Sequence, residues 1–307
     1  MTTTGTAAPD GDAPSVPIAE VSRLLGIPMP TLRSWELRYD MPKRIREVGT
    51  HRRYTPAELH GLRLMRDEIA RGKQANVAAE SVRVLLGRTG PSAEFLTQLL
   101  DASGRSDPIA VREQLDRAQA ALGLAACLDD VLLPAMQQVG LWWQTGRCNV
   151  EQEQLTTEVA RGWLETLTSY APSPIHPCPI VLACGPTDLH TIGLEGLGIL
   201  LRYQGWPCRL LGARTAVPAL AAAIQASSAA GVVVVSHLKT GRQRAIQSLL
   251  AAQTLGVRVF YAGNAFNSPR SRRGVPGGYL GTNLGVACGL INTALIADPI
   301  TPLESAS

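Results

Sequence analysis

The sequence has no long apolar run. Of its 307 residues 45% are hydrophobic, yet no apolar stretch reaches the roughly 18 residues that a membrane-spanning helix needs. The first residues, MTTTGTAAPDGDAPS, have neither a basic start nor an apolar centre, which argues against a signal peptide. We therefore expect a cytoplasmic protein with no membrane partner, and a disordered tail at residues 1–15.

The cysteines lack the spacings of metal-binding and redox motifs. The six cysteines stand at positions 127, 148, 178, 184, 208 and 288, with no CxxC pair among them. In a cytoplasmic protein such residues are expected to be free, mostly buried thiols. The net charge is only +4, but one short stretch concentrates five basic residues against a single acid: Lys43, Arg44, Arg46, Arg52 and Arg53. Such a stretch can neutralise phosphate groups.

The length predicts two or three domains. A compact segment at 16–88 precedes GRTGPS at 87–92, which is typical of a linker, and apolar residues then recur at helical spacing over 93–170. Four prolines at 171–179 interrupt the chain. Beyond them short strands alternate with helices, which indicates a doubly wound parallel sheet. We expect domains at 16–88, 92–171 and 177–300.

The segment 18–40 is predicted to form two short helices separated by a turn at Gly26. In the second helix, residues 29–40, the apolar face is expected to contain Leu32, Trp35 and Leu37, whereas Arg33 and Arg38 face solvent. A short helix, a turn and a basic helix fit the major groove of DNA. Residues 43–54 are expected to form a hairpin that turns at Gly49, and TPAEL at 55–59 is a typical helix start.

Three stretches carry a family resemblance in the N-terminal segment. IAEVSRLLGI (18–27), TLRSWELRYD (31–40) and GTHRRYTPAEL (49–59) resemble, in this order, the MerR family of winged helix-turn-helix regulators. The resemblance implies that Arg33 and Arg38 lie on the recognition helix and that Arg52, Arg53 and Tyr54 belong to a DNA-binding wing. It implies double-stranded operator DNA as the partner. We expect Trp35 and Tyr39 to lie in the core instead.

Polar loops follow two of the predicted C-terminal strands. The loop after 179–184 reads GPTDLHTIG (185–193), and the loop after 231–236 begins HLKTG. Ligands bind beyond the carboxyl ends of strands where the strand order reverses, which in a flavodoxin-like sheet lies between these two strands. Asp188 can accept a hydrogen bond from one ring nitrogen of His190, which makes the other nitrogen a better metal ligand. Gly193 leaves room for a bulky ligand.

These loops resemble the cobalamin-binding domain of methionine synthase and its relatives. The matching residues of its Asp-x-His-x-x-Gly, Ser-x-Leu and Gly-Gly motifs are Asp188, His190, Gly193, Ser236, Leu238 and Gly263. The first glycine of the Gly-Gly turn is replaced by Ala262. The resemblance implies that His190 coordinates cobalt from below, and that Ser236 faces the displaced nucleotide base in a slot of the domain.

The preceding helical segment carries a Trp, nine residues and then a Glu, namely Trp143 and Glu153. With the two other modules this order resembles the CarH/LitR group of light-responsive, adenosylcobalamin-dependent repressors. The group's histidine after the glutamate is replaced by Gln154, and Gln144 stands where some members have a second cobalt ligand. The resemblance implies a four-helix bundle that covers the upper face of adenosylcobalamin, and a homo-oligomer, either a dimer or a tetramer.

The sequence therefore predicts an all-α winged helix-turn-helix, then a four-helix bundle, then an α/β flavodoxin-like doubly wound parallel sheet. The expected function is a non-enzymatic transcriptional repressor that uses adenosylcobalamin as a light-sensing ligand. Two alternatives remain open. The changes at Gln154 and Ala262 favour a MerR-type regulator whose pocket takes another ligand or a protein partner. The other is a corrinoid methyl carrier, against which the winged helix argues.

Overall fold

The computed structural model describes residues 16–42, 53–54, 56–70, 74–86, 91–144 and 149–297. The predicted tail at 1–15, most of the predicted hairpin (43–52), Thr55 and the linker residues 87–90 lie outside this part. The chain forms two compact units, one of residues 1–93 with 138–149 and the other of residues 94–137 with 150–307. Among the described helices, none combines the length and the apolar character that a bilayer crossing requires.

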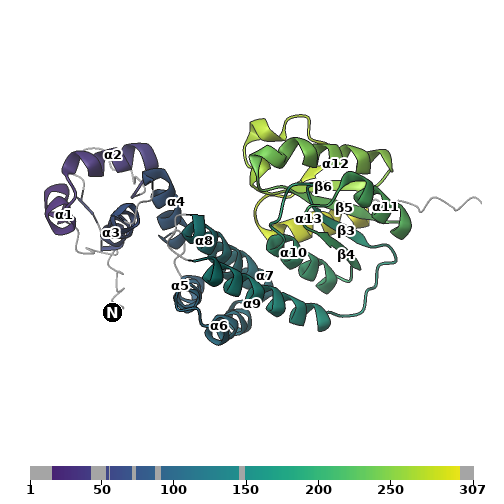
Figure 1. The fold of residues 1–307 in the computed structure, drawn as a ribbon, viewed down its shortest axis with the longest axis horizontal. Coiled ribbons are helices and arrows are strands. Elements are labelled where there is room, and N and C mark those ends of the chain that lie inside the picture. Colours follow the sequence, from purple (N-terminus) through teal and green to yellow (C-terminus); the bar gives the residue numbers. More distant parts are fainter. Residues whose placement is uncertain are drawn as a thin grey trace, which may run out of the picture. The chain divides into compact units, whose positions relative to one another are not determined.

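The first unit contains the helix-turn-helix segment. Its described helices are α1 (Ile18–Leu25), α2 (Met29–Tyr39), α3 (Pro56–Ala70) and α4 (Ala75–Leu86) (Figure 1). Helix α1 has the predicted bounds, and Gly26 ends it with φ of 66°, a left-handed conformation that glycine adopts without strain. Both predicted helices of the 18–40 segment are confirmed.

A short sheet lies in the segment that was predicted to be all-α. Strand β1 (Val16–Pro17) pairs antiparallel with β2 (Arg53–Tyr54), so that Val16 stands opposite Tyr54. The pairing satisfies backbone groups of the chain where it enters α1 and where it approaches α3. The expectation of an all-α N-terminal domain is therefore wrong in this respect.

Helix α2 buries a different face from the predicted one. Leu32, Trp35 and Glu36 are buried, whereas the side chain of Leu37 is 72% exposed. With 3.6 residues per turn, positions three and four apart share a face, so Glu36 lies beside Leu32 and Leu37 turns away. The predicted inward position of Leu37 is wrong, and the core position of Trp35 is confirmed. Tyr39 is half-buried against the same core.

The second unit begins with helices. They are α5 (Pro91–Gly104), α6 (Pro108–Leu122), α7 (Leu124–Cys127), the π-helix η1 (Leu128–Leu132), α8 (Leu133–Gln144), which extends into the first unit, and α9 (Val150–Ser169). Asp107 caps α6 by accepting a hydrogen bond from the Ala110 amide at 3.0 Å. Helix α6 packs along α9, where Trp163 Nε1 donates to Asp116 Oδ1 at 2.9 Å.

The sheet of the second unit is parallel. Its strands are β3 (Ile180–Cys184), β4 (Cys208–Gly212), β5 (Gly231–Val235), β6 (Arg258–Ala262) and β7 (Gly278–Tyr279). They are ordered β4-β3-β5-β6-β7, and every pairing is parallel. Five strands ordered second, first, third, fourth, fifth have the order of a flavodoxin-like sheet. The predicted parallel sheet is confirmed, and so is the predicted switch between its first and third strands.

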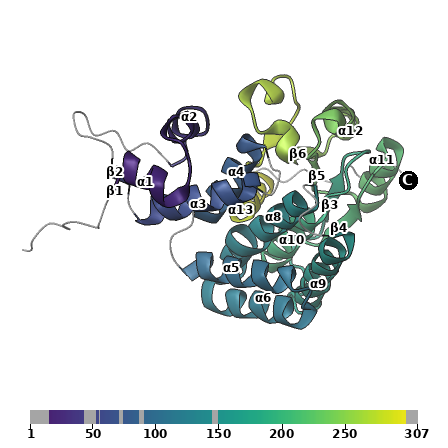
Figure 2. The ribbon, with the colours of Figure 1, turned by 60° about the vertical axis from the view of Figure 1, so that its left-hand side comes forward.

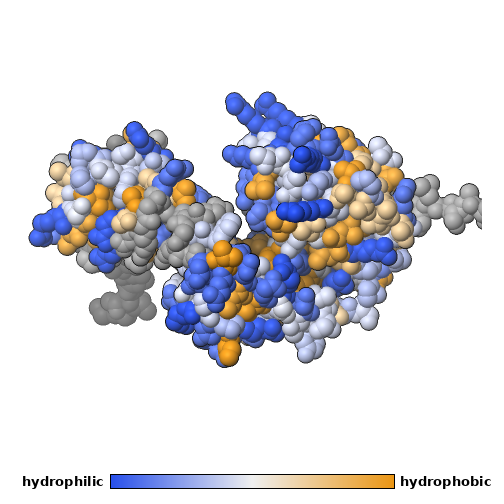
Figure 3. Space-filling view, in the orientation of Figure 1, coloured by the Kyte–Doolittle hydropathy of each residue, from blue (hydrophilic) through white to orange (hydrophobic). Residues whose placement is uncertain are grey.

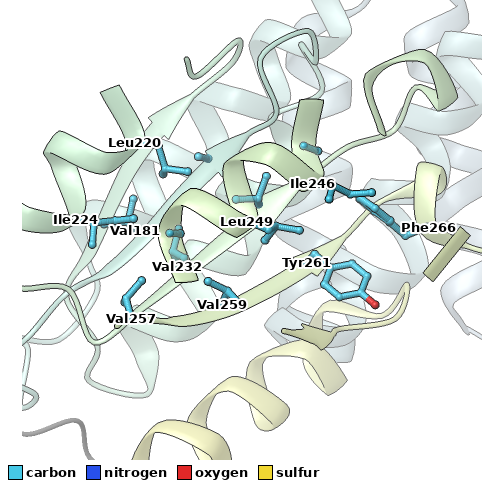
Figure 4. Packing of buried hydrophobic residues seen from close by; sticks show 14 of the residues in the cluster. Val181, Leu220, Ile224, Val232, Ile246, Leu249, Val257, Val259, Tyr261 and Phe266 are labelled. Atoms are coloured by element: carbon cyan, nitrogen blue, oxygen red, sulfur yellow. The ribbon is translucent and has the colours of Figure 1, made fainter. Parts of the chain in front are cut away.

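Helices cover both faces of this sheet. On one face lie α10 (Ile192–Tyr203) and α13 (Leu284–Ala297), and on the other α11 (Val217–Ser227) and α12 (Arg242–Thr254) (Figure 2). Figure 4 shows strand valines such as Val232 packing against Leu220 of α11 and Leu249 of α12. Burial of both faces explains why β5 is a continuous run of valines.

Two polar links join the first helices of the second unit to the helices that cover its sheet. Asp129 in η1 accepts hydrogen bonds from the backbone amides of Leu284 and Gly285, at 2.6 and 3.0 Å, and so caps α13. Arg161 of α9 forms an ion pair with Glu195 of α10, with Nε and Oε1 3.5 Å apart. Most of the predicted segment 92–171 thus lies in one compact unit with 177–300, while residues 138–149 belong to the first unit. The division of these segments by function stays a prediction.

Candidate functional site

The loops after β3 and β5 meet where the strand order reverses. Asp188 lies in the first loop and is 1% exposed. Its Oδ1 accepts hydrogen bonds from the Nδ1 of His190 at 2.7 Å and from the His190 backbone amide at 3.0 Å. Its Oδ2 accepts a hydrogen bond from the backbone amide of His237, in the second loop. One buried carboxylate therefore joins the two loops and orients the imidazole of His190.

The electrostatics of the pair favour an ionised Asp188. Burial opposes ionisation, but the hydrogen bonds from the His190 ring and from the two backbone amides outweigh it, so the pKa of Asp188 lies well below its usual range. The pKa of His190 is raised, chiefly by its bond to Asp188, and the carboxylate of Glu153 contributes. With Nδ1 donating to Asp188, the other ring nitrogen, Nε2, is the one available to a ligand.

A second histidine, His237, belongs to this cluster. Its ring centroid lies 5.2 Å from that of His190, at an interplanar angle of 53°. Burial lowers its pKa. The predicted site contains its neighbours Ser236 and Leu238 but not His237. The available signal was its place in the loop that faces Asp188 across the switch point.

The hydroxyl group of Ser236 is buried without a hydrogen-bond partner. It is 1% exposed, and its hydroxyl has no hydrogen-bond partner among the described residues. Leaving such a group unsatisfied costs about 1–3 kcal/mol, so a ligand atom that bonds to it gains affinity. Gly263 lies against the Ser236 backbone with φ of 100°, and a Cβ there would stand 2.3 Å from the Ser236 carbonyl oxygen. Only glycine fits at 263.

The remaining predicted cofactor residues differ in their surroundings. A Cβ on Gly193 would meet Leu133 Cδ2 at 3.6 Å, so the backbone does not itself require glycine there. Leu238 is 45% exposed. Glu153 is half-buried on α9 and accepts a hydrogen bond from Thr157 Oγ1 at 3.2 Å. Trp143 belongs to the first unit and is 49% exposed, which excludes a fully buried core role in the described chain.

No group of three or more His, Cys, Asp or Glu side chains is arranged to hold a metal ion in the described ranges. A corrinoid would bring most of the ligands of its cobalt with it, so the protein would need to contribute only a single side chain such as His190. The buried Asp188 and the unpartnered Ser236 hydroxyl fit such a group.

The described cysteines are free, as predicted. Burial raises the pKa of Cys127, Cys184 and Cys208 to about 12, so these side chains remain thiols at neutral pH. Cys148 lies outside the described residues.

The predicted DNA-binding residues separate into two groups. Arg33 and Arg38 of α2 and Arg53 of β2 are exposed, whereas Arg52 lies outside the described residues. Tyr54 is 0% exposed, and its hydroxyl donates to Glu36 Oε1 at 2.8 Å. The prediction that the Tyr54 side chain contacts DNA is therefore wrong, because its ring fills the core of the first unit and its hydroxyl bonds within it.

Replacing Tyr54 by phenylalanine is expected to destabilise the first unit. The change removes a hydrogen bond to the buried Glu36 carboxylate, so the free energy of unfolding should fall by about 1–3 kcal/mol. Urea unfolding of the full chain measures it. Tyr39→Phe, at a half-buried position of the same core, is the matched control and should change stability by less. Equal stability of both variants would contradict this role.

Two protein-family models match this chain. Residues 16–82 match the model of the MerR HTH family regulatory protein, and residues 96–168 match that of the B12 binding domain. The structure of the Methanosarcina barkeri monomethylamine corrinoid protein is similar over 66% of this chain and 98% of its own length, with a TM-score of 0.55. At 15% identity this likeness shows the shared fold alone.

Two relatives come from Myxococcus xanthus. The HTH-type transcriptional repressor CarA is 33% identical over 210 residues, which are 66% of this chain and 70% of CarA. The HTH-type transcriptional repressor CarH is 31% identical over 219 residues, 67% of this chain and 73% of CarH. The chain therefore belongs to the family of MerR-type regulators with a B12 binding domain that includes CarA and CarH.

Proposed function

We propose that this protein is a cytoplasmic transcriptional repressor that uses adenosylcobalamin to sense light. Family membership makes it a DNA-binding, cobalamin-binding transcriptional regulator. The adenosyl form of the cofactor, the response to light and the direction of regulation are the proposed part. The observation that carries the cofactor assignment is the His190–Asp188 hydrogen bond of 2.7 Å at the strand-order switch.

His190 is proposed as the lower axial ligand of cobalt. Asp188 fixes the ring by accepting the Nδ1 proton, which aims Nε2 away from the carboxylate and increases its basicity. Because Asp188 also holds the His237 amide, the loop after β5 is positioned together with the ligand. One carboxylate thus holds both loops in place, which lowers the entropic cost of binding a cofactor there.

Ser236 and Gly263 are proposed to hold the nucleotide base of the cofactor. The unpartnered Ser236 hydroxyl offers a hydrogen bond within the buried region. Gly263 allows its loop to lie directly on the Ser236 backbone, where the Ala265 amide donates to the Ser236 carbonyl at 3.0 Å. Gly193 and Leu238 are proposed to line the approach of the ring. Ala262 does not have the positive φ of Gly263, so its own backbone does not require glycine.

The upper face of the cofactor is assigned to Trp143 and Glu153, with the helices 92–171 as a four-helix bundle. When bound, adenosylcobalamin supplies a cobalt–carbon bond that light breaks. Trp143 and Glu153 hold the adenosyl group in the dark and thereby favour a homo-oligomer, a dimer or a tetramer, that grips the operator through several winged helices. The protein binds and positions the cofactor without turning over a substrate.

Illumination is expected to release the protein from DNA. The protein is loaded with adenosylcobalamin in the dark, and its molar mass is followed by light scattering and its affinity for its own promoter fragment by a gel shift. Light should lower the mass and weaken promoter binding by about 10- to 100-fold, a usual size for coupling between two sites. Protein without cobalamin is the control and should not respond to light.

The illuminated protein is also expected to lose cobalamin on dialysis. Gln144 stands where some members of the group have a histidine, and an amide is a poor cobalt ligand.

An unchanged molar mass and an unchanged promoter affinity after illumination of the cobalamin-bound protein would contradict the light-sensing role. Cobalamin binding would remain in place.

A further inference from the structure

The second unit contains a long stretch without acidic residues. Residues 196–297 include no Asp or Glu, whereas they include ten basic residues, of which nine are Arg. The rest of the chain has 19 basic and 25 acidic residues. The whole positive excess of the protein therefore lies in the sheet and its helices, from α10 to α13.

Six of these ten residues gather in two neighbouring segments. One is the 3-10 helix η2 (Lys239–Gly241) with the start of α12, and the other is the 3-10 helix η4 (Pro269–Arg272) with the residue after it. Arg242 Nε donates to the Ser271 carbonyl at 2.8 Å and ties the two segments together. We call this set the basic patch: Lys239, Arg242, Arg244, Arg270, Arg272 and Arg273. Figure 3 shows hydrophilic side chains crowded over α12 and the loop after β6.

The charges of the basic patch are not neutralised within the described chain. None of its six residues forms an ion pair among the described residues, and Lys239, Arg244, Arg270 and Arg273 are exposed. Like charges that lie together without counter-charges raise the local electrostatic potential and attract anions from solution. The patch is therefore suited to an anionic partner outside its own unit.

The η4 part of the patch is well ordered by its own hydrogen bonds. The Ser268 hydroxyl accepts from the Ser271 amide at 3.2 Å, and the Ser268 amide donates to the Ser271 hydroxyl at 3.1 Å. The guanidinium of Arg272 lies 4.5 Å from the centre of the Tyr279 ring. A loop held in this way presents its arginines without a further cost for ordering its backbone on binding.

We propose that the basic patch binds phosphate groups of double-stranded DNA and forms a second DNA-contacting surface besides α2. Arginine predominates, and its planar guanidinium matches the oxygens of a phosphate better than lysine does. The protein already holds a duplex through its helix-turn-helix, so the patch meets the flanking DNA at high effective concentration. The contact reads no sequence and depends on salt. It rests on DNA binding by the family and not on the cofactor.

Removing three exposed arginines of the patch tests the proposal. Full-length Arg244→Gln/Arg270→Gln/Arg273→Gln is compared with wild type for binding to mixed-sequence double-stranded DNA over a range of salt, without cobalamin. In a plot of log affinity against log salt concentration, the slope of the patch variant should be smaller than that of wild type by about 2–3 units, since each lost phosphate contact removes about 0.9. Arg105→Gln/Arg117→Gln/Arg209→Gln removes the same charge from exposed positions outside the patch and should keep the wild-type slope.

A background without the recognition-helix arginine separates the two surfaces. In Arg33→Ala, residual salt-dependent binding to mixed-sequence DNA should persist, and adding the three patch substitutions should reduce it further. Equal slopes for the patch variant and its matched control would overturn the proposal. If the patch variant has a smaller molar mass by light scattering but unchanged DNA binding, the patch contacts another copy of the chain. If the variant binds cobalamin more weakly, the patch contacts the phosphate of the cofactor. Either result overturns the proposal too.

Discussion

His190→Ala is expected to weaken cobalamin binding by about 100-fold or more and to abolish the absorption spectrum of histidine-ligated cobalamin. The substitution removes the ring that Asp188 orients and leaves a buried carboxylate with one partner fewer. Loss of an orienting partner alone costs 10–100-fold in metal affinity, so Asp188→Asn should give an intermediate loss. Titration with adenosylcobalamin in the dark, followed by absorption, measures both.

His237→Ala is the matched control for this experiment. Its ring is 5.2 Å from that of His190, but only its backbone amide bonds to Asp188, and alanine keeps that amide. The variant should retain the histidine-ligated spectrum. If His190→Ala keeps wild-type affinity and spectrum while His190→Ala/His237→Ala loses both, then His237 is the ligand and the assignment is wrong. DNA binding without cobalamin should be unaffected in all these variants.

Arg33→Ala is expected to abolish operator-specific binding. Arg33 is exposed on α2, which we propose as the recognition helix that enters the major groove. One lost base or phosphate contact of this kind costs about 1–3 kcal/mol, and a dimer or tetramer loses it once per bound subunit. A gel shift with the promoter fragment against mixed-sequence competitor measures the specific part. Unchanged specific binding would remove Arg33 from the interface.

Two exposed arginines serve as comparisons for Arg33. Arg53→Ala, in the predicted wing, should weaken binding to all sequences alike and flatten the salt dependence by about one unit. Arg105→Ala lies on an exposed position of the second unit and should leave operator binding unchanged. A loss of sequence specificity in Arg33→Ala indicates a base contact, whereas a weaker salt dependence in Arg53→Ala indicates a phosphate contact.

Local sequence signals predicted the regular elements well. The bounds of α1 match the prediction because Gly26 ends the helix. Short apolar runs between turns marked the strands of the parallel sheet. The switch point followed from the order of strands and helices along the chain, because a parallel sheet of this kind has few allowed connections. Asp188 and His190 were found from their spacing, and the structure brings them into contact.

The errors arose where tertiary contacts override the local pattern. Because Leu37 is apolar and Glu36 is charged, Leu37 was predicted to lie in the core and Glu36 was not. Glu36 is buried, however, and the Tyr54 hydroxyl donates a hydrogen bond to its carboxylate. Tyr54 was assigned to the DNA-binding wing by the family resemblance, although its ring is buried in the core. His237 was left out of the predicted site because its place there depends on a carboxylate 49 residues earlier in the chain. The short helices η2 and η4 and the single compact unit formed by helices and sheet also depend on contacts between distant segments.

The cap that Asp129 provides for α13 makes two backbone amides reporters of the helical segment. The Leu284 and Gly285 amides are bonded to a side chain from a residue more than 150 positions earlier, and not to a carbonyl of their own helix. Their hydrogens are protected from exchange with solvent only while η1 stays against α13, since the first amides of a helix have no partner within it. Any opening of the helices above the sheet therefore appears first as faster exchange at these two positions, well before the sheet itself loosens.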